Sequence, residues 1–121
     1  MNIIPIMKCR DMDESVRFYT EVLDFKVLNP ESENSYILLI RDGARLDLST
    51  NSGDGVLGNR VNIIVSNVDA LFQKFIRRGL NTSNKQESPV HQGPVDQTWG
   101  MREFYADDPD GNTLRFGQLI V

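Results

Sequence analysis

The sequence predicts an α+β domain built from two tandem modules, each with the order strand–helix–strand–strand–strand (βαβββ). Three observations predict it. Short apolar strands alternate with two amphipathic helices, the order of these elements repeats along the chain, and two hairpin turns fall at equivalent places in the repeat. The chain has 121 residues, which is enough for one domain with its own hydrophobic core.

The first helix is predicted from Asp11 to Leu23. Asp11 can cap the helix, and Glu14 three residues later completes a pattern that resembles a capping box. Val16, Tyr19 and Leu23 then fall on one helical face. This segment is therefore expected to be an amphipathic helix that packs on a sheet.

The second helix has a stronger apolar period. It begins after Asn67, a capping residue, and Gly79 is its expected end. Its apolar positions follow the spacing i, i+3, i+4, i+7, i+8, at Val68, Leu71, Phe72, Phe75 and Ile76. The caps Asp11 and Asn67 lie 56 positions apart.

The hairpins also repeat, at a spacing of 68 positions, since residues 40–48 resemble residues 108–116. The matching pairs are Gly43 with Gly111, Leu46 with Leu114, and Leu48 with Phe116. The two spacings differ by 12, so the second module carries about 12 extra residues, expected near residues 87–98. These residues form the inserted loop.

Strands are predicted near residues 2–9, 26–30, 35–41 and 44–50, then 59–66, 81–86, 100–107 and 112–119. The chain is thus expected to be a single domain, 1–121, with module one at about 1–50, a linker at about 51–58, and module two at about 59–121. A ferredoxin-like α+β domain with an accidental repeat is the alternative.

Composition narrows the function. The chain shows no apolar run long enough to span a membrane and no signal-peptide pattern at its start. Its single cysteine, Cys9, excludes an internal disulfide, which together with the missing leader predicts a cytoplasmic protein. The net charge of −4 argues against broad nucleic-acid binding.

Several motifs resemble one known family. They are Pro5 with Arg10-Asp11, Phe18-Tyr19, Trp99-Gly100, Arg102-Glu103-Phe104 and Asp108-Pro109-Asp110-Gly111. The chain resembles the vicinal oxygen chelate superfamily (glyoxalase, bleomycin resistance protein, extradiol dioxygenase), and most of all its bleomycin-resistance-like members. This resemblance implies curved mixed sheets that form a cup, with each helix on the outside.

Strand alternation assigns the two faces of each sheet. Leu46 and Leu48 should face the helix in module one, and Leu114 and Phe116 should do so in module two. The cup side then carries Arg45, Asp47 and Ser49 in module one, and Arg60, Asn62, Ile64, Thr113, Arg115 and Gly117 in module two.

The resemblance places the family's metal ligands at Ile4, Asp47, Arg60 and Arg115. Isoleucine has no donor atom, and guanidinium groups repel a cation. We therefore expect no metal and no other cofactor. No nucleophile signature occurs in the sequence either, which favours a protein that is not an enzyme.

The candidate ligand-binding residues are Asp47, Arg60, Asn62, His91, Trp99 and Arg115. Each has a plainer interpretation. Arg60 and Arg115 could have no role beyond neutralising the charge of Asp47. His91 could be a solvated loop residue, and Trp99 could be a loop anchor packed on the core. Trp99 follows the inserted loop and could instead line a pocket.

The leading hypothesis is a metal-free protein that sequesters a small molecule, such as a bleomycin-like antibiotic or an aromatic compound, in a pocket at a dimer interface. The cup side is expected to carry Ile4, Ile6 and Ile64, an apolar surface that a second copy can cover, which favours a homodimer. Two alternatives stay open: a metal-dependent lyase or dioxygenase of the same superfamily, and a non-catalytic structural or regulatory member.

Overall fold

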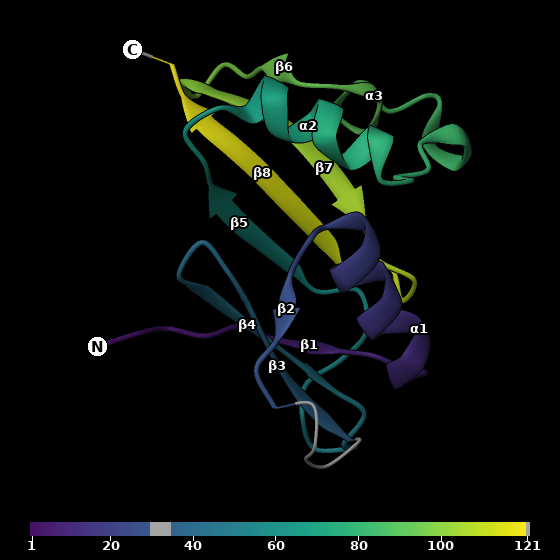
Figure 1. Ribbon diagram of the computed structural model, residues 1–121. Coiled ribbons are helices and arrows are strands. Elements are labelled where there is room, and N and C mark those ends of the chain that lie inside the picture. The colour runs from purple at the N-terminus through teal and green to yellow at the C-terminus, as the bar shows by residue number, and fades with distance from the viewer. Residues whose placement is uncertain (30–34, 121) are drawn as a thin grey trace. The chain divides into compact units, whose positions relative to one another are not determined.

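The computed structural model describes residues 1–29 and 35–120, and within them it shows two four-stranded mixed sheets with helices (Figure 1). The first sheet has the order β1 (Ile6–Lys8), β4 (Ala44–Ser49), β3 (Tyr36–Arg41), β2 (Lys26–Val27). The second has the order β5 (Arg60–Ile64), β8 (Thr113–Leu119), β7 (Met101–Asp107), β6 (Val95–Asp96). In each sheet the first strand pairs in parallel and the others pair antiparallel. The predicted pair of βαβββ modules is confirmed.

The chain divides into two units by its contacts. One unit comprises residues 1–59 together with Asp108–Asn112, and the other comprises Arg60–Asp107 and the residues from Thr113 onward. The turn that joins β7 to β8 therefore belongs to the first unit, although both of its strands belong to the second.

The helix of the first unit consists of α1 (Met12–Arg17) followed by a π-helical segment, η1 (Phe18–Val22). The side chain of Asp11 accepts a hydrogen bond from the backbone N–H of Glu14 at 3.2 Å, which confirms the predicted cap. Ser15, Tyr19 and Leu23, spaced four residues apart, are fully buried. Val16 is only partly buried, so Ser15 takes the place that the sequence predicted for Val16 on the buried face of the helix.

The helix of the second unit, α2 (Val68–Arg77), begins and ends where the sequence predicted. Asn67 accepts a hydrogen bond from the backbone N–H of Ala70 at 3.0 Å. At the other end, the N–H of Leu80 bonds the carbonyl of Phe75, and the N–H of Gly79 bonds the carbonyl of Ile76. These two bonds form a Schellman motif, which needs a left-handed residue at Gly79 (φ 106°).

Each core lies between a sheet and its helix, on the face that alternation predicted. In the second unit, Phe104 and Phe116 stack at 5.1 Å between ring centroids, and Phe75 of α2 meets both rings edge-on. In the first unit Leu46 and Leu48 are buried, and α1 contacts β4. Since successive side chains of a strand point to opposite faces, the other face of each sheet carries the polar residues, together with apolar ones such as Ile6, Leu38 and Ile64. We call it the polar face.

The strand predicted at residues 81–86 is wrong. This stretch contains a short 3₁₀ helix, η2 (Ser83–Lys85), because the side chain of Asn81 accepts hydrogen bonds from the backbone N–H and hydroxyl of Ser83 and favours a local turn over a sheet ladder. The inserted loop contains a helical turn, α3 (Pro89–Gln92), and then β6, which supplies the fourth strand instead.

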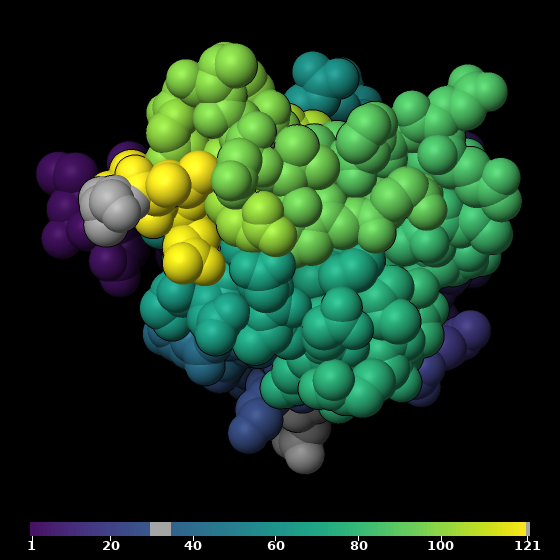
Figure 2. All heavy atoms as spheres, turned by 90° about the horizontal axis from the view of Figure 1, so that it is seen from above, coloured from purple at the N-terminus to yellow at the C-terminus, as the bar shows by residue number. Residues whose placement is uncertain are grey.

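In the space-filling view of Figure 2, the green segment between α2 and β7 forms a continuous part of the surface of its unit. No helix in the described part of the chain is long and apolar enough to cross a membrane.

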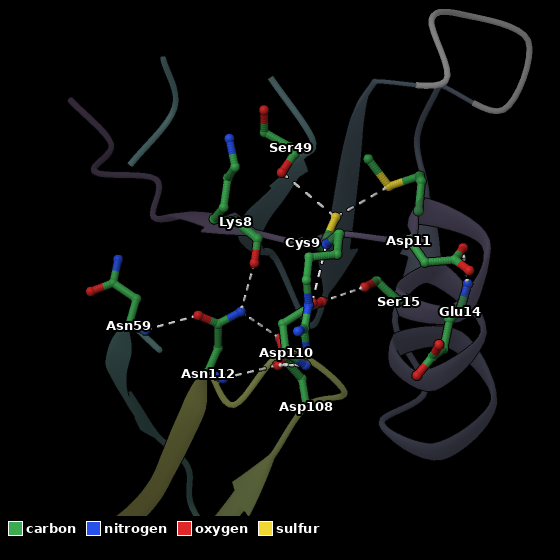
Figure 3. Close-up of polar contacts among 12 residues, drawn as sticks. Lys8, Cys9, Asp11, Glu14, Ser15, Ser49, Asn59, Asp108, Asp110 and Asn112 are labelled. Atoms are coloured by element: carbon green, nitrogen blue, oxygen red, sulfur yellow. Dashed lines mark hydrogen bonds and ion pairs between the residues drawn. The ribbon is translucent and has the colours of Figure 1, made fainter. Parts of the chain in front are cut away.

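Buried polar contacts hold the Asp108–Asn112 turn within the first unit (Figure 3). The side-chain amide of Asn112, which is fully buried, donates to the carbonyl of Lys8 at 2.9 Å and to Asp108 at 2.8 Å. Its side-chain oxygen accepts from the N–H of Asn59 at 2.8 Å. The hydroxyl of Tyr19 donates to Asp108 at 2.8 Å. Burial raises the pKa of Asp108, although its hydrogen bonds act in the opposite direction.

Candidate functional site

The polar face of the second unit is the face of β5, β8 and β7 that turns away from the buried aromatic residues. Strand register fixes its centre. Arg115 of β8 lies between Asn62 of β5 and Tyr105 of β7, and Glu103 lies opposite Gly117 on the same face. Neighbouring side chains on one face of a sheet lie about 5 Å apart, so these groups form one contiguous patch.

Arg115 dominates this patch. Its guanidinium carbon lies 4.9 Å from the centre of the Tyr105 ring, a cation–π contact. Its Nη2 atom donates to Glu103 Oε1 at 3.4 Å, its only hydrogen bond among the described residues. A guanidinium has five N–H donors, and the buried Nε has no partner within residues 1–29 and 35–120. The side chain keeps 26% of its surface exposed, so the group has spare donors near solvent.

Gly117 gives Glu103 the room to reach Arg115. A Cβ atom at position 117 would lie 2.9 Å from the Met101 side chain and 3.3 Å from Cγ of Glu103. The side chain of Glu103 therefore packs across the backbone of β8 at a point where only glycine leaves space. It is 6% exposed, and it holds the guanidinium from one side.

His91 extends the same patch from the inserted loop. Its Nε2 lies 3.1 Å from Asp107 Oδ1, its Nδ1 lies 2.7 Å from the hydroxyl of Ser88, and its ring meets Tyr105 edge-on at 5.7 Å. Because a carboxylate only accepts, Nε2 donates its proton to Asp107, and Nδ1 pairs with the hydroxyl of Ser88. The interpretation of His91 as a solvated loop residue is wrong, since its side chain is only 13% exposed.

Asp107 anchors this histidine. Its carboxylate also accepts from the hydroxyl of Thr113 at 2.8 Å and lies 3.4 Å from Nζ of Lys85. Burial acts to raise the pKa of Asp107, but the hydrogen bonds from His91 and Thr113 outweigh it, and the pKa lies below its usual value. The charged carboxylate thus fixes the position of α3 against β7.

The polar face of the first unit is centred on Asp47, which is 6% exposed. One of its oxygens accepts from the Tyr36 hydroxyl and the other from Nη2 of Arg45, both at 2.8 Å. Burial, followed by the hydrogen bond to this carboxylate, raises the pKa of Tyr36 to about 12. In the sheet register Asp47 lies beside Ile6 and Leu38, so its other neighbours are apolar.

The remaining predicted residues lie on the surface. Arg60 is exposed at the start of β5, and Asn62 is exposed two residues later. Trp99 occupies a turn just before β7 and is 57% exposed. More than half of its surface is open to solvent, so it is not a core residue, and both the pocket wall and the loop anchor packed on the core stay predictions. Its role in ligand binding stays a prediction.

The residues at the expected metal positions do not fit a divalent cation. Asp47 is already engaged by Tyr36 and Arg45. The strand register also differs from the expected ligand positions, since Ile6 and not Ile4 lies beside Asp47, and Asn62 and not Arg60 lies beside Arg115. In the second unit the corresponding position holds the cation Arg115. Among the described residues, no three His, Cys, Asp or Glu side chains gather where they could hold a metal ion.

Alternation could have revealed three partner residues that the sequence prediction missed. Tyr36, Glu103 and Tyr105 lie on the polar faces and contact the predicted residues directly. Placing Phe104 in the core already implies that its neighbours Glu103 and Tyr105 point the other way. The contact between Ser88 and His91 had no comparable signal, because it depends on the helical turn α3.

The sequence and the fold agree on one family. The family model of the Glyoxalase/Bleomycin resistance protein/Dioxygenase superfamily matches residues 6–116, and the chain belongs to this superfamily. No curated protein matches the chain in sequence.

Solved structures share the fold. A bleomycin resistance determinant encoded on transposon Tn5 is 20% identical with a TM-score of 0.80, covering 100% of this chain and 99% of that one. A bleomycin-binding protein complexed with bleomycin is 21% identical with a TM-score of 0.76, covering 98% of each chain. The bleomycin-binding protein of Streptomyces verticillus, complexed with copper(II)-bleomycin, is 24% identical with a TM-score of 0.73, covering 96% of this chain and 93% of that one.

Proposed function

We propose that this protein binds a small molecule stoichiometrically, without a metal or a catalytic step, and acts by sequestering it in the cytoplasm. We place the ligand in a pocket at the interface of a homodimer. The residues that we propose to contact it are Asp47, Arg60, Asn62, His91, Trp99 and Arg115.

The observation that carries this proposal is the spare hydrogen-bonding capacity of the polar face in the second unit. Arg115 is partly buried but makes one long hydrogen bond within the described residues, and Asn62 beside it is exposed. The Nε of Arg115 is buried, so the donors that a ligand can reach are the remaining N–H groups of the two terminal nitrogens, on a side chain that is 26% exposed. A ligand that accepts hydrogen bonds can pair with them.

Similar proteins support the same class of function. Two of the similar structures are bleomycin-binding proteins solved with bleomycin or its copper complex. Their sequence identity of 21–24% supports a shared binding mode more than a shared ligand. This chain has one tryptophan and a net charge of only −4, and it places arginines on its polar faces. We therefore propose small-molecule binding as the function, with the ligand to be identified by a thermal-shift screen.

A thermal-shift screen with bleomycin, other glycopeptide antibiotics and aromatic metabolites tests the proposal. A ligand present at 100 times its dissociation constant should stabilise the protein by about 2.7 kcal/mol. Calorimetry should then give one stoichiometric binding event with no turnover of the ligand. One tightly bound equivalent of zinc, iron or manganese per purified chain would instead support the metal-dependent enzyme of the same superfamily.

Light scattering tests the homodimer. Ile6 and Ile64 on the polar faces are 38% and 67% exposed, which leaves apolar surface that a second copy can cover. The expected mass is twice that of the 13.8 kDa chain. A monomer at micromolar concentration would contradict the dimer-interface pocket.

A further inference from the structure

Resting on the proposed function, the geometry points to a carboxylate ligand: we infer that Arg115 and Asn62 form an anion subsite, so that this protein favours an anionic ligand over a cationic one. The inference concerns the charge of the ligand, which the fold leaves open. Two arginines of the second unit, Arg102 and Arg115, differ in how their guanidinium groups are bonded, and this difference supports the inference.

Arg102 shows what a structural arginine looks like in this unit. Its guanidinium makes four hydrogen bonds, to both oxygens of Asp69 and to Asp96, at 2.8 to 3.3 Å. Its charge and donor geometry are therefore used within the protein. Arg115 makes one hydrogen bond of 3.4 Å within the described residues, longer than the 2.7–2.9 Å typical of a charge-assisted bond. The two arginines carry the same charge, but only Arg115 keeps its donors available.

The surroundings orient the guanidinium of Arg115 without satisfying it. Tyr105 lies against one face of the group, and Glu103 contacts only Nη2. These contacts fix the plane of the fork and lower the entropy lost when a ligand binds. The side chain of Asn62, next to Arg115 in the register, has an amide that can donate to the same ligand. A carboxylate has two acceptor oxygens in one plane. It can accept one hydrogen bond from Arg115 and one from Asn62, or two from the guanidinium of Arg115.

Glu103 explains why the ligand should be a single carboxylate rather than a polyanion. Its buried carboxylate already offsets part of the positive charge and would repel a highly charged group. An added monoanion shares Arg115 with Glu103, as two carboxylates often share one guanidinium. A cationic group in the same place would meet the guanidinium directly and would leave its free donors unused.

Three planar probes of the same shape separate the charge states: benzoate, benzamide and benzamidine. Binding is measured by NMR titration of the labelled protein, with shifts followed at Asn62, Tyr105 and Arg115. Benzoate should bind at least about tenfold more tightly than either other probe, with its largest shifts at these residues. Benzamidine binding as well as benzoate, or benzoate leaving these residues unshifted, would overturn the inference.

Matched variants assign the effect to the subsite. Arg115→Gln should abolish the preference for benzoate, and Arg115→Lys should restore only part of it, because lysine keeps the charge but loses the planar fork. Asn62→Ala should weaken benzoate binding by a few-fold. Arg77→Gln removes an exposed arginine at the end of α2 and should leave the affinity unchanged. An equal loss in Arg77→Gln would show that only net charge attracts the probe, and would overturn the subsite.

The outcomes also separate this inference from the proposed function. A ligand found in the thermal-shift screen that binds stoichiometrically and is insensitive to Arg115→Gln would leave the function standing and show the anion subsite to be wrong. If benzoate binds as described but every screened compound fails to show stoichiometric binding, the subsite stands and the sequestration function is wrong.

Discussion

At the centre of the polar face in the first unit lies a carboxylate, Asp47, whereas the equivalent place in the second unit holds the guanidinium of Arg115. The two residues are 68 positions apart, the spacing of the repeated hairpins. Each pairs with its edge strand in the same way, Asp47 with Ile6 and Arg115 with Asn62. One backbone arrangement thus carries opposite charges at matching positions.

The partners of these charges also occupy matching positions. Tyr36 lies opposite Ser49 in the first unit, and Glu103 lies opposite Gly117 in the second. Tyr36 donates to the carboxylate of Asp47, and Glu103 accepts from Arg115. A pair of strand positions therefore keeps its polar contact while donor and acceptor exchange roles.

The difference teaches that the two faces of each sheet are under separate constraints. On the core side the repeat keeps apolar residues at the same places, Leu46 with Leu114 and Leu48 with Phe116, because close packing tolerates little change. In the second unit the polar side meets the short helical turn α3 through His91 and not the core helix α2, so its chemistry can change without disturbing the core. We therefore expect ligand binding to depend on the residues of the polar faces.

The hairpin turns provide the largest expected contrast between the halves of the repeat. Asn112 is fully buried and makes three side-chain hydrogen bonds, to Lys8, Asp108 and Asn59. Asn112→Ala should destabilise the protein by about 3 kcal/mol, because several buried groups lose their partners together. Chemical denaturation measures the loss. Ala44 is the equivalent residue of the first hairpin and is exposed, so Ala44→Ser should change stability by less than about 0.5 kcal/mol. Equal effects in the two variants would contradict the structural role of the turn.

Trp99 tests the part of the second unit that has no counterpart in the first, the inserted loop and the turn that follows it. Trp99→Ala should weaken any ligand identified in the screen by about tenfold or more, since an exposed indole contributes stacking and area to binding rather than to the core. Its thermal stability should stay within a degree or two of the unmodified protein. Ile76→Ala, at an exposed apolar residue of α2, is the control and should leave the affinity unchanged. A drop in stability with unchanged affinity would place the pocket elsewhere.

Asp107 distinguishes the two units by the pH dependence of stability. The first unit has the apolar Ile40 at the equivalent register position, and only the second unit has a titratable group there. The folded pKa of Asp107 lies below its usual value of 3.8. Its carboxylate therefore stabilises the fold above that pH, and the contribution is lost as the pH falls through the lower folded pKa. Asp107→Asn should cost about 1 kcal/mol at neutral pH, and the gap to the unmodified protein should close in acid.

Denaturation curves at several pH values measure that gap. Glu87→Gln, at an exposed position of the inserted loop, should show no such gap at any pH. A difference that stays constant from neutral pH into acid would mean that the charge of Asp107 is not what holds His91 and α3.

Tyr36 gives the smallest expected effect. Tyr36→Phe removes one hydrogen bond from Asp47 but leaves the bond from Arg45, so the loss should be about 0.5–1 kcal/mol. The pKa of Tyr36 is raised to about 12, and burial raises the pKa of Tyr19 as well, so both phenols should ionise late in an ultraviolet titration. Tyr36→Phe should remove one of these two late-ionising groups. A late phase of equal amplitude in the variant and the unmodified protein would contradict the contact of Tyr36 with Asp47.

The sequence by itself determined the features that depend on local chemistry. Asp11 and Asn67 cap helices because their side chains reach backbone N–H groups three residues away, and Gly79 ends α2 because it accepts a left-handed conformation. Alternation separated the core face from the polar face in β4, β5 and β8, since the side-chain period of a strand is fixed by its backbone. The repeat of these signals was sufficient to predict two βαβββ modules.

Only the tertiary structure decided which residues those local elements bring together. Val95–Asp96 forms the fourth strand of the second sheet, and His91 pairs with Asp107. Asn112 is buried in the first unit, although the strands on either side of its turn belong to the second unit. These outcomes rest on contacts between residues up to 104 positions apart, as between Asn112 and Lys8. Their energy depends on burial and on the exact position of each partner, neither of which leaves a periodic signal in the sequence. The contacts of Asp47 with Tyr36 and of Arg115 with Glu103 belong to the same group, because the register of neighbouring strands brings these residues together.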